Sequence, residues 1–129
     1  CIRDRGLPFY GGCVTYRFGV DCPGGDIRLT VPHYDGALTE IFVDGAHAGE
    51  IIFPPYELEL KELSAGRHEI EVKLYTNRRN AFGTVHLYDK KCHWIGPDAW
   101  RTSGCKWSYE YVLRNVGVES APVIYSLKK

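Results

Sequence analysis

The side chains best suited to chemistry gather in one polar corner of the sequence, at residues 74–86. The stretch reads LYTNRRNAFGTVH, and it follows a run of alternating apolar and polar residues at 67–75. Amide, guanidinium and imidazole groups are planar, and they can form paired hydrogen bonds to the hydroxyls of a sugar. Aromatic rings offer the flat face that the C–H edges of a pyranose need. The candidate ligand-binding residues are therefore the polar Asn77, Arg78, Arg79, Asn80, His86 and His33, together with the aromatic Tyr34, Trp94 and Trp100.

The same corner has a second interpretation in which it binds no ligand. Asparagines in turns often hydrogen-bond their own backbone or adopt left-handed geometry. Arg78 and Arg79 could pair with carboxylates of a neighbouring domain, and Trp94 and Trp100 could fix an irregular segment to the core. Turn chemistry favours the structural or interdomain role for residues 77–80, with direct sugar contact as the alternative. For the two tryptophans, neither role is favoured.

No arrangement of residues predicts a catalytic centre. Glycoside cleavage commonly uses two carboxyl groups on opposite sides of the bond. Asp98 and Glu110 lie among aromatic residues without forming an evident pair, and the glutamates at positions 57, 59, 69 and 71 alternate along runs that should face solvent. The G-x-S-x-G motif of a nucleophile elbow is missing, and the histidines lack metal-ligand spacing. The sequence thus predicts no catalytic residue, no metal and no cofactor.

The composition is that of an ordinary globular domain. The chain has 129 residues, 44% hydrophobic and 25% charged, which is enough for one domain with its own core. Sixteen basic residues balance sixteen acidic ones, so there is no electrostatic footprint for nucleic acid or an anionic membrane. No apolar run approaches the length of a membrane-spanning helix. We therefore expect one domain over residues 1–129, with neither nucleic acid nor a membrane as a partner.

The cysteines favour reduced thiols. They lie at positions 1, 13, 22, 92 and 105, and none forms a C-x-x-C pair. An odd number at wide spacing is typical of a reducing compartment, which favours the cytoplasm. Two disulfides stay open as alternatives, Cys13–Cys22 across a hairpin and Cys92–Cys105 closing a loop. Because the chain begins at Cys1 and contains no methionine, we expect it to be excised from a longer protein.

The periodicity of the chain predicts an all-β fold. Apolar and polar residues alternate in short runs, with turn signals at roughly the eight-to-twelve-residue spacing of sandwiches and jelly rolls. Asp44-Gly45 lies between two apolar runs and predicts a tight hairpin turn. The residues predicted to face inward are Val14, Tyr16, Phe18, Val20, Ile27, Leu29, Val31, Tyr56, Leu58, Leu60, His68, Ile70, Val72 and Leu74.

The last third of the chain departs from this pattern. Residues 88–106 hold two tryptophans, a proline and two glycines without a clear period, which predicts a long irregular aromatic loop. Alternation resumes at 107–113 and 122–127, so both segments are predicted strands. In the first of them, Trp107, Tyr109 and Tyr111 would form an aromatic face of the core.

Four motifs in the middle of the chain resemble a known kind of domain. VDGAHAG at 43–49 is followed by PPYELEL at 54–60 and GRHEIEV at 66–72, and NRRNAFG at 77–83 closes the series. The pattern is similar to the galactose-binding-like jelly-roll domains appended to glycoside hydrolases, including the family 2 type of β-galactosidases and β-glucuronidases. The flanking stretches at 4–18 and 94–113 resemble the C-terminal region of large bacterial glycosidase-like proteins. The resemblance implies a jelly-roll β-sandwich with a binding site in the loops at one end.

The expected function is that of a non-catalytic accessory domain in a bacterial glycoside hydrolase. It would bind carbohydrate weakly, brace the catalytic domain of its parent chain, or do both. One alternative is a small stand-alone carbohydrate-active enzyme with its site in the aromatic loop at 88–110, which predicts a deep pocket holding two groups whose pKa values are pushed apart. Asp98, Glu110 or a histidine would act there. A second alternative is a pure structural scaffold, which predicts an exposed apolar patch.

Overall fold

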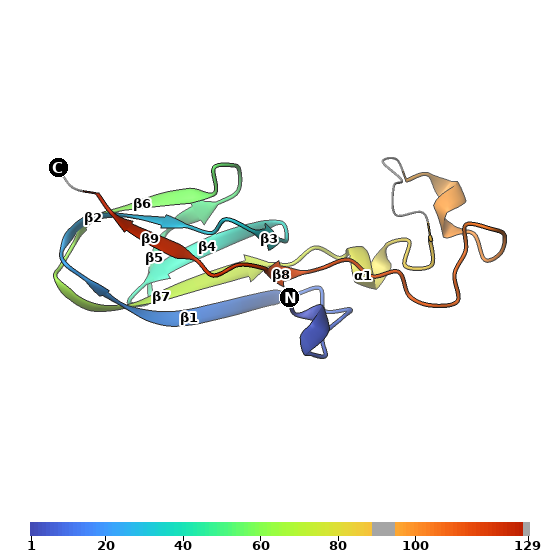
Figure 1. The fold of residues 1–129 in the computed structure, drawn as a ribbon, viewed down its shortest axis with the longest axis horizontal. Helices are drawn as coiled ribbons and strands as arrows, with labels where there is room; N and C mark the ends of the chain where they lie inside the picture. The colour runs from blue at the N-terminus through green and yellow to red at the C-terminus, as the bar shows by residue number, and fades with distance from the viewer. Residues whose placement is uncertain (89–94, 128–129) are drawn as a thin grey trace.

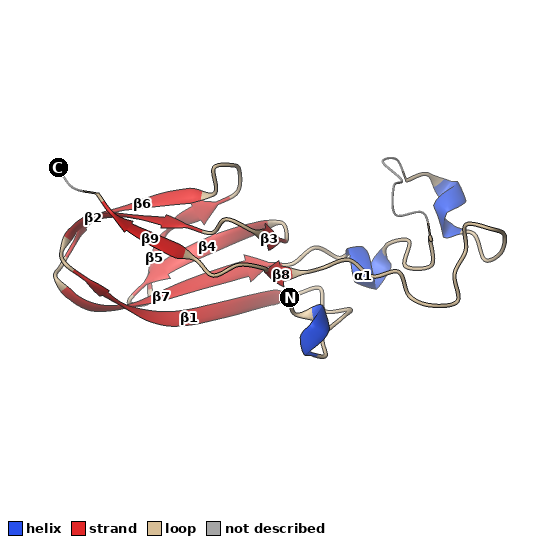
Figure 2. Ribbon diagram, viewed as in Figure 1, coloured by secondary structure: helices blue, strands red, loops and turns tan. Residues whose placement is uncertain are grey.

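Strands dominate the computed structural model, which describes residues 1–88 and 95–127 (Figures 1 and 2). Short helical turns occur at η1 (Arg3–Arg5), α1 (Arg79–Phe82) and η2 (Pro97–Trp100). The strands are β1 (Cys13–Cys22), β2 (Gly25–Thr30), β3 (Tyr34–Asp35), β4 (Leu38–Val43), β5 (Ala46–Ile51), β6 (Glu57–Leu63), β7 (Gly66–Tyr75), β8 (Gly117–Val118) and β9 (Val123–Ser126). The predicted all-β class is confirmed.

The strands form two layers of antiparallel sheet. One sheet has the order β1-β7-β4-β5 and the other the order β6-β2-β9, while β3 and β8 form a small separate pair. The chain crosses between the layers repeatedly, because β1 is followed by β2 in the other sheet, and β5, β6 and β7 alternate between the two. This arrangement is the predicted β-sandwich.

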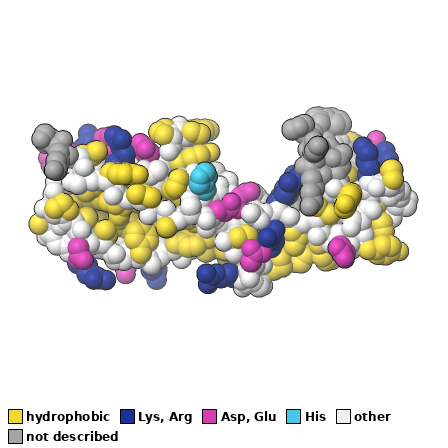
Figure 3. All heavy atoms as spheres, in the orientation of Figure 1, with side chains coloured by type: hydrophobic (Ala, Val, Ile, Leu, Met, Phe, Trp, Pro, Cys, Tyr) yellow, Lys and Arg dark blue, Asp and Glu magenta, His cyan; other side chains and the backbone are white. Residues whose placement is uncertain are grey.

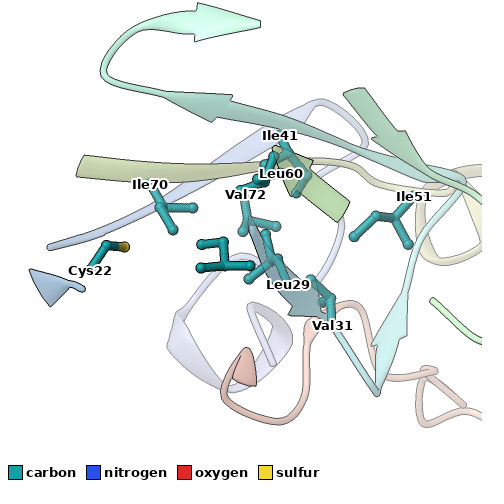
Figure 4. Close-up of a cluster of buried hydrophobic side chains, with 9 residues drawn as sticks. Cys22, Leu29, Val31, Ile41, Ile51, Leu60, Ile70 and Val72 are labelled. Atoms are coloured by element: carbon teal, nitrogen blue, oxygen red, sulfur yellow. The ribbon is translucent and has the colours of Figure 1, made fainter. Parts of the chain in front are cut away.

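The core lies between the two sheets and follows the predicted alternation. β1 and β7 pair so that Tyr16 lies opposite Val72 and Phe18 opposite Ile70. Leu29 of β2 is fully buried, and Figure 4 shows it among side chains contributed by both sheets. The residues between Val14 and Leu74 that were predicted to face inward are all buried or half-buried. Period-two burial on paired strands is what fixes the register of a sheet, since a slip of one residue would expose the whole apolar set.

The turn between β4 and β5 forms at Asp44-Gly45, as predicted. Both residues have positive φ, 50° for Asp44 and 80° for Gly45, as a two-residue hairpin turn requires. Asp44 also joins this turn to β7, because its Oδ1 accepts the N–H of Glu69 at 2.8 Å and its Oδ2 lies 2.6 Å from Nδ1 of His68. The other ring nitrogen of His68 lies 3.0 Å from the carbonyl oxygen of Ser64. The buried histidine is thus a structural residue with both nitrogens bonded.

The free-thiol prediction is confirmed for the four described cysteines, at positions 1, 13, 22 and 105. Cys13 and Cys22 are the first and last residues of β1, so the alternative of a bond between them across a hairpin is wrong. A strand of 10 residues spans roughly 30 Å, whereas a disulfide needs Cα atoms within about 7 Å. Cys92 lies outside the described residues, and with it the Cys92–Cys105 alternative.

A long arm projects from one end of the sandwich between α1 and β8 (Figure 1). We define the arm as residues 83–88 and 95–112. Its two legs are joined by backbone hydrogen bonds, with Ser108 N–H donating to the carbonyl of His86 at 2.8 Å and Tyr88 N–H to that of Lys106 at 2.9 Å. The long irregular loop of the prediction corresponds to the end of this arm.

The strand predicted at 107–113 is wrong. Within the described part of the chain, residues 107–113 form one isolated β-bridge, between Trp107 and Leu87, and no strand. The predicted aromatic core face is wrong as well, because the side chain of Tyr109 is 88% exposed and that of Tyr111 is 58% exposed. Alternation of residue types indicates a strand only where a sheet lies alongside to pair it and a core lies beneath to bury it. The arm lies beyond both.

Candidate functional site

The predicted polar corner lies where the sandwich passes into the arm, and not at a turn between two strands. β7 ends at Tyr75, and Asn77 stands between that strand and α1. The Asn77 Oδ1 accepts the N–H of Arg79 at 3.1 Å, and its Nδ2 donates to Oδ1 of Asp35 at 2.6 Å. One amide side chain therefore connects the start of α1 to β3. We define the junction as Asp35, Asn77, Arg79, Asn80 and Arg114.

Asn80 holds the returning leg of the chain at the junction. Its side chain is buried, its Nδ2 donates to the carbonyl oxygen of Arg114 at 2.9 Å, and its Oδ1 accepts the N–H of Arg114 at 2.9 Å. A single amide thereby satisfies both backbone groups of one residue, as a strand neighbour would. The contact fixes residue 114 against α1, although the two are far apart in sequence.

A cavity of about 370 Å³ opens beside the junction. Burial raises the pKa of Asp35, and this effect outweighs the hydrogen bond from Asn77 and the nearby Arg79 and Arg114, which lower it. Raised carboxyl pKa values are common in functional clefts and also occur in structural networks. The cavity is lined by Asp35, Val112, Leu113, Arg114, Asn115 and Glu119.

The eight predicted ligand-binding residues that the structure describes do not come together in one site. Asn77, Arg79 and Asn80 meet at the junction, and the exposed Arg78 lies beside Gly11. The amides of Asn77 and Asn80 are engaged with protein groups, which favours the structural interpretation for these two side chains. Sugar contact by residues 77–80 stays a prediction.

The other predicted residues lie on separate elements. Tyr34 contributes to the sandwich, because its hydroxyl donates to the carbonyl of Ile51 at 3.0 Å and its ring meets that of Tyr56 edge-on. His33 is exposed, and its carbonyl oxygen accepts the N–H of Glu119 at 2.8 Å. His86 and Trp100 belong to the arm, where Trp100 is exposed at the end of η2. Trp94 lies outside the described residues.

The arm carries its own aromatic cluster. Nδ1 of His86 lies 2.8 Å from the carbonyl oxygen of Ser108, which orients the ring. That ring stacks on Trp107 with centroids 5.7 Å apart and contacts Tyr111 at 5.0 Å. Tyr111 in turn meets Phe9 edge-on at 5.1 Å. The cluster therefore joins both legs of the arm to the segment that follows η1.

An open groove runs along the base of the arm beside this cluster. Its volume is about 380 Å³, and its lining combines two tyrosine rings, two charged side chains, a serine and an apolar floor. The arm supplies its aromatic rings and one carboxylate, and η1 supplies an arginine. We call it the arm groove; its lining residues are Arg3, Tyr88, Ser108, Glu110, Tyr111, Val112 and Leu113.

The arrangement offers little to catalysis. Asp98 is exposed and pairs with Arg101 at 2.9 Å, and Glu110 is exposed in the open arm groove. Neither the junction cavity nor the arm groove is the deep pocket with two coupled groups that a stand-alone enzyme predicts. Over the same residues, no cluster of histidine, cysteine and acidic side chains could hold a metal. Within that part of the chain, no helix is long and apolar enough to cross a membrane.

Sequence reasoning missed several residues that shape these sites. Asp35 and Arg114 complete the junction, and Arg3 lines the arm groove. The sequence carried one usable signal, since Asp35-Gly36 is a second Asp-Gly pair and marks a bend that brings Asp35 to an end of the sandwich. Arg114 and Arg3 carried none, because their contacts depend on how the arm returns to the sandwich.

A comparison with solved structures matches this chain to parts of two enzymes, and the first match shows a shared fold. A rhamnosidase from Novosphingobium sp. PP1Y matches with a TM-score of 0.62 and 18% identity over 92% of this chain. A GH2 beta-galacturonidase from Eisenbergiella tayi, bound to galacturonate, matches with a TM-score of 0.44 and 26% identity over 54% of this chain. The chain covers 11% of the first protein and 12% of the second. No family model and no curated protein matches it.

Proposed function

We propose that this chain is an accessory β-sandwich domain of a glycoside hydrolase, and that it braces the catalytic domain of its parent protein through the arm. The observation that carries the proposal is the exposed aromatic surface of the arm and of α1 at its base. Figure 3 shows hydrophobic side chains along the underside of the arm. The exposed rings are Phe82, Tyr88, Trp100, Tyr109 and Tyr111.

Such a surface is costly to leave in water. Burying apolar area stabilises by roughly 25 cal/mol per Å², and large contiguous exposed patches commonly mark interaction sites. Tyr109 and Phe82 are 88% and 74% exposed, so most of their surface is free to be covered. Aromatic residues are also enriched among the side chains that dominate protein interfaces. A projecting arm with these rings is suited to insert between neighbouring domains.

The proposed occupant is another domain of the same parent chain. The rhamnosidase whose segment shares this fold is much longer, with this chain covering 11% of it, so the fold occurs there as a small part of a longer protein. The charges do not oppose a close intramolecular contact, because the net formal charge is zero. The parent would act on a glycoside, with a rhamnoside as the first substrate to try.

The test compares the longer protein that contains this sequence with the isolated chain. We expect the double variant Phe82→Ser/Tyr109→Ser to lower the Tm of the parent by several degrees, since interface aromatics commonly contribute about 2 kcal/mol each. The same change should leave the Tm of the isolated chain almost unchanged. Tyr125→Ser is the matched control, because Tyr125 is an exposed ring on β9, away from the arm. Equal effects of the arm pair and the control in the parent would contradict the bracing role.

Weak carbohydrate binding is the second candidate function. The specific observation in its favour is the arm groove, where aromatic rings and hydrogen-bonding groups line one open space. Such a combination of apolar surface with a few polar groups is typical of small-ligand sites. A glycan array on the isolated chain tests this function, with a millimolar or tighter hit as the expected result and silence on all glycans as the contrary one.

A further inference from the structure

We infer that the arm groove is a subsite for a neutral pyranose, with Tyr111 as the stacking platform and Glu110 as the acceptor for sugar hydroxyls. The inference rests on the carbohydrate-binding function proposed above, and it names a site and a charge preference that this function does not specify. The volume of about 380 Å³ lies within the range of roughly 300–1,000 Å³ typical of small-ligand pockets.

The aromatic platform is preorganised. The Tyr111 ring is held from two sides, by Phe9 with centroids 5.1 Å apart and by His86 at 5.0 Å. His86 is itself oriented by the Ser108 carbonyl oxygen at 2.8 Å from Nδ1. Tyr111 nevertheless remains 58% exposed, so part of it is open to a ligand. A rigid exposed ring loses little conformational entropy when a sugar stacks on it.

The polar groups of the groove suit hydroxyls. The backbone N–H of Glu110 donates to Oγ of Ser108 at 3.2 Å, which fixes the turn that presents the glutamate. Within residues 1–88 and 95–127, the Glu110 carboxylate has no ion-pair partner, and its two oxygens can each accept a hydroxyl proton. A carboxylate can accept hydrogen bonds from two neighbouring hydroxyls of a pyranose. Val112 and Leu113 supply the apolar floor.

The charge balance favours a neutral sugar over a uronic acid. Arg3 is the cation of the groove, and its Nε donates to Oδ1 of Asp4 at 2.8 Å, so its charge is already compensated. Within residues 1–88 and 95–127, no ion pair compensates the Glu110 carboxylate, which the arm contributes to the groove. A sugar carboxylate in the groove would therefore meet a like charge at short range, which disfavours binding.

The experiment is a titration of the 15N-labelled 129-residue chain, followed by NMR, with methyl α-rhamnoside, methyl β-galactoside and galacturonate as separate probes. We expect shifts of the backbone amides at 108–113 with a Kd near 1 mM for at least one neutral glycoside, which corresponds to about −4 kcal/mol. Galacturonate should bind at least tenfold more weakly. The difference in affinity between the neutral glycoside and galacturonate should become smaller for Glu110→Gln, because this variant removes the negative charge and keeps the side-chain length.

Variants separate this inference from the broader function. Tyr111→Ala should abolish binding, whereas Tyr109→Ala should leave it unchanged, because Tyr109 is an exposed ring on the same segment that does not line the groove. If the arm amides of unliganded Tyr111→Ala shift widely or lose dispersion, the variant has disturbed the arm. Ser108→Ala and Glu110→Gln then test the same site through its polar groups. A glycan array hit that none of these variants weakens would overturn the groove and leave carbohydrate binding intact. If none of the glycosides shifts the amides at 108–113 at ~10 mM, the proposed sugar subsite is wrong. If the glycan array also shows no binding, the carbohydrate-binding function is wrong as well. Neither result bears on the bracing function.

Discussion

The sandwich and the arm both carry aromatic residues at alternating positions, but these rings differ in their exposure to solvent. In the sandwich, Tyr16 and Phe18 on β1 lie opposite Val72 and Ile70 and pack against the core. In the arm, Tyr109 and Tyr111 also alternate along the chain, yet both are mostly exposed. The two sheets of the sandwich cover each other's inward faces, whereas the described part of the arm has only its two legs and the aromatic cluster around His86. The difference teaches that one burial rule applies to both regions, and under the proposed bracing function the parent protein would supply the partners of the arm.

The junction connects the sandwich to the arm. Asn80 binds both backbone groups of Arg114, and Asn77 connects α1 to Asp35. These contacts hold the base of the arm without burying the arm itself. A fixed base makes an exposed arm useful, because a rigid projection loses less entropy on docking than a loose one.

The largest effect should come from the sandwich core. Leu29 is fully buried between the sheets, so Leu29→Ala removes packed side-chain volume and should destabilise the chain by about 2–5 kcal/mol. Urea unfolding followed by circular dichroism measures this change. A loss below ~1 kcal/mol would mean that the core is much looser than its burial indicates.

The next effect should come from the junction. Asn80→Ala leaves the N–H and C=O of Arg114 without their partner, and we expect a loss of about 1–3 kcal/mol in unfolding free energy. The exposed neighbour Arg78 supplies the control, because Arg78→Ala should change the free energy by less than ~0.5 kcal/mol. If the two variants were equally stable, the proposed clamp would have no energetic role.

The pair between Asp44 and His68 should make the stability of the sandwich depend on pH. The hydrogen bond to Asp44 raises the pKa of His68 above its ordinary 6.5, and the same bond lowers the pKa of Asp44 below its ordinary 3.8. The histidine contribution is complete below pH 6.5 and disappears as the pH rises through the higher, folded-state pKa. The aspartate contribution is complete above pH 3.8 and disappears as the pH falls through the lower, folded-state pKa.

The Tm difference between the wild type and His68→Asn should therefore be largest between about pH 4 and 6.5, and should shrink above that range. Thermal melts in a series of buffers measure it, with His33→Asn, at an exposed histidine, as the control for loss of an imidazole. A Tm difference that stayed constant from pH 5 to 9 would show that protonation of His68 adds nothing to the fold.

The smallest effect should come from the arm. Tyr109→Ala removes a ring that is 88% exposed, so the unfolding free energy of the isolated chain should change by no more than ~0.5 kcal/mol. The comparison with Leu29→Ala uses the same urea titration. A loss of 2 kcal/mol or more at Tyr109 would show that the arm packs on the sandwich and would remove the distinction between the two regions.

The sandwich could be predicted from the sequence because its strands satisfy each other. The inward residues of β2 and β7 and the turn at Asp44-Gly45 follow from period-two burial and turn chemistry, which are local signals. The arm could not be predicted in this way. The alternation at 107–113 resembles that of a strand. The rings of Tyr109 and Tyr111 stay exposed because no sheet pairs with this segment, and the sequence does not show this. The contact of Asn80 with Arg114 joins residues whose approach depends on the whole path of the arm.

Hydrogen exchange tests the central claim most directly. Backbone amides of the arm at 83–88 and 95–112 should exchange faster in the isolated 129-residue chain than those of β1, β4 and β7, because the arm lies outside the two sheets. In the longer parent protein the amides at the same arm positions should become strongly protected, because the exposed rings then pack against the catalytic domain. Equal exchange of the arm in the two proteins would contradict the bracing function.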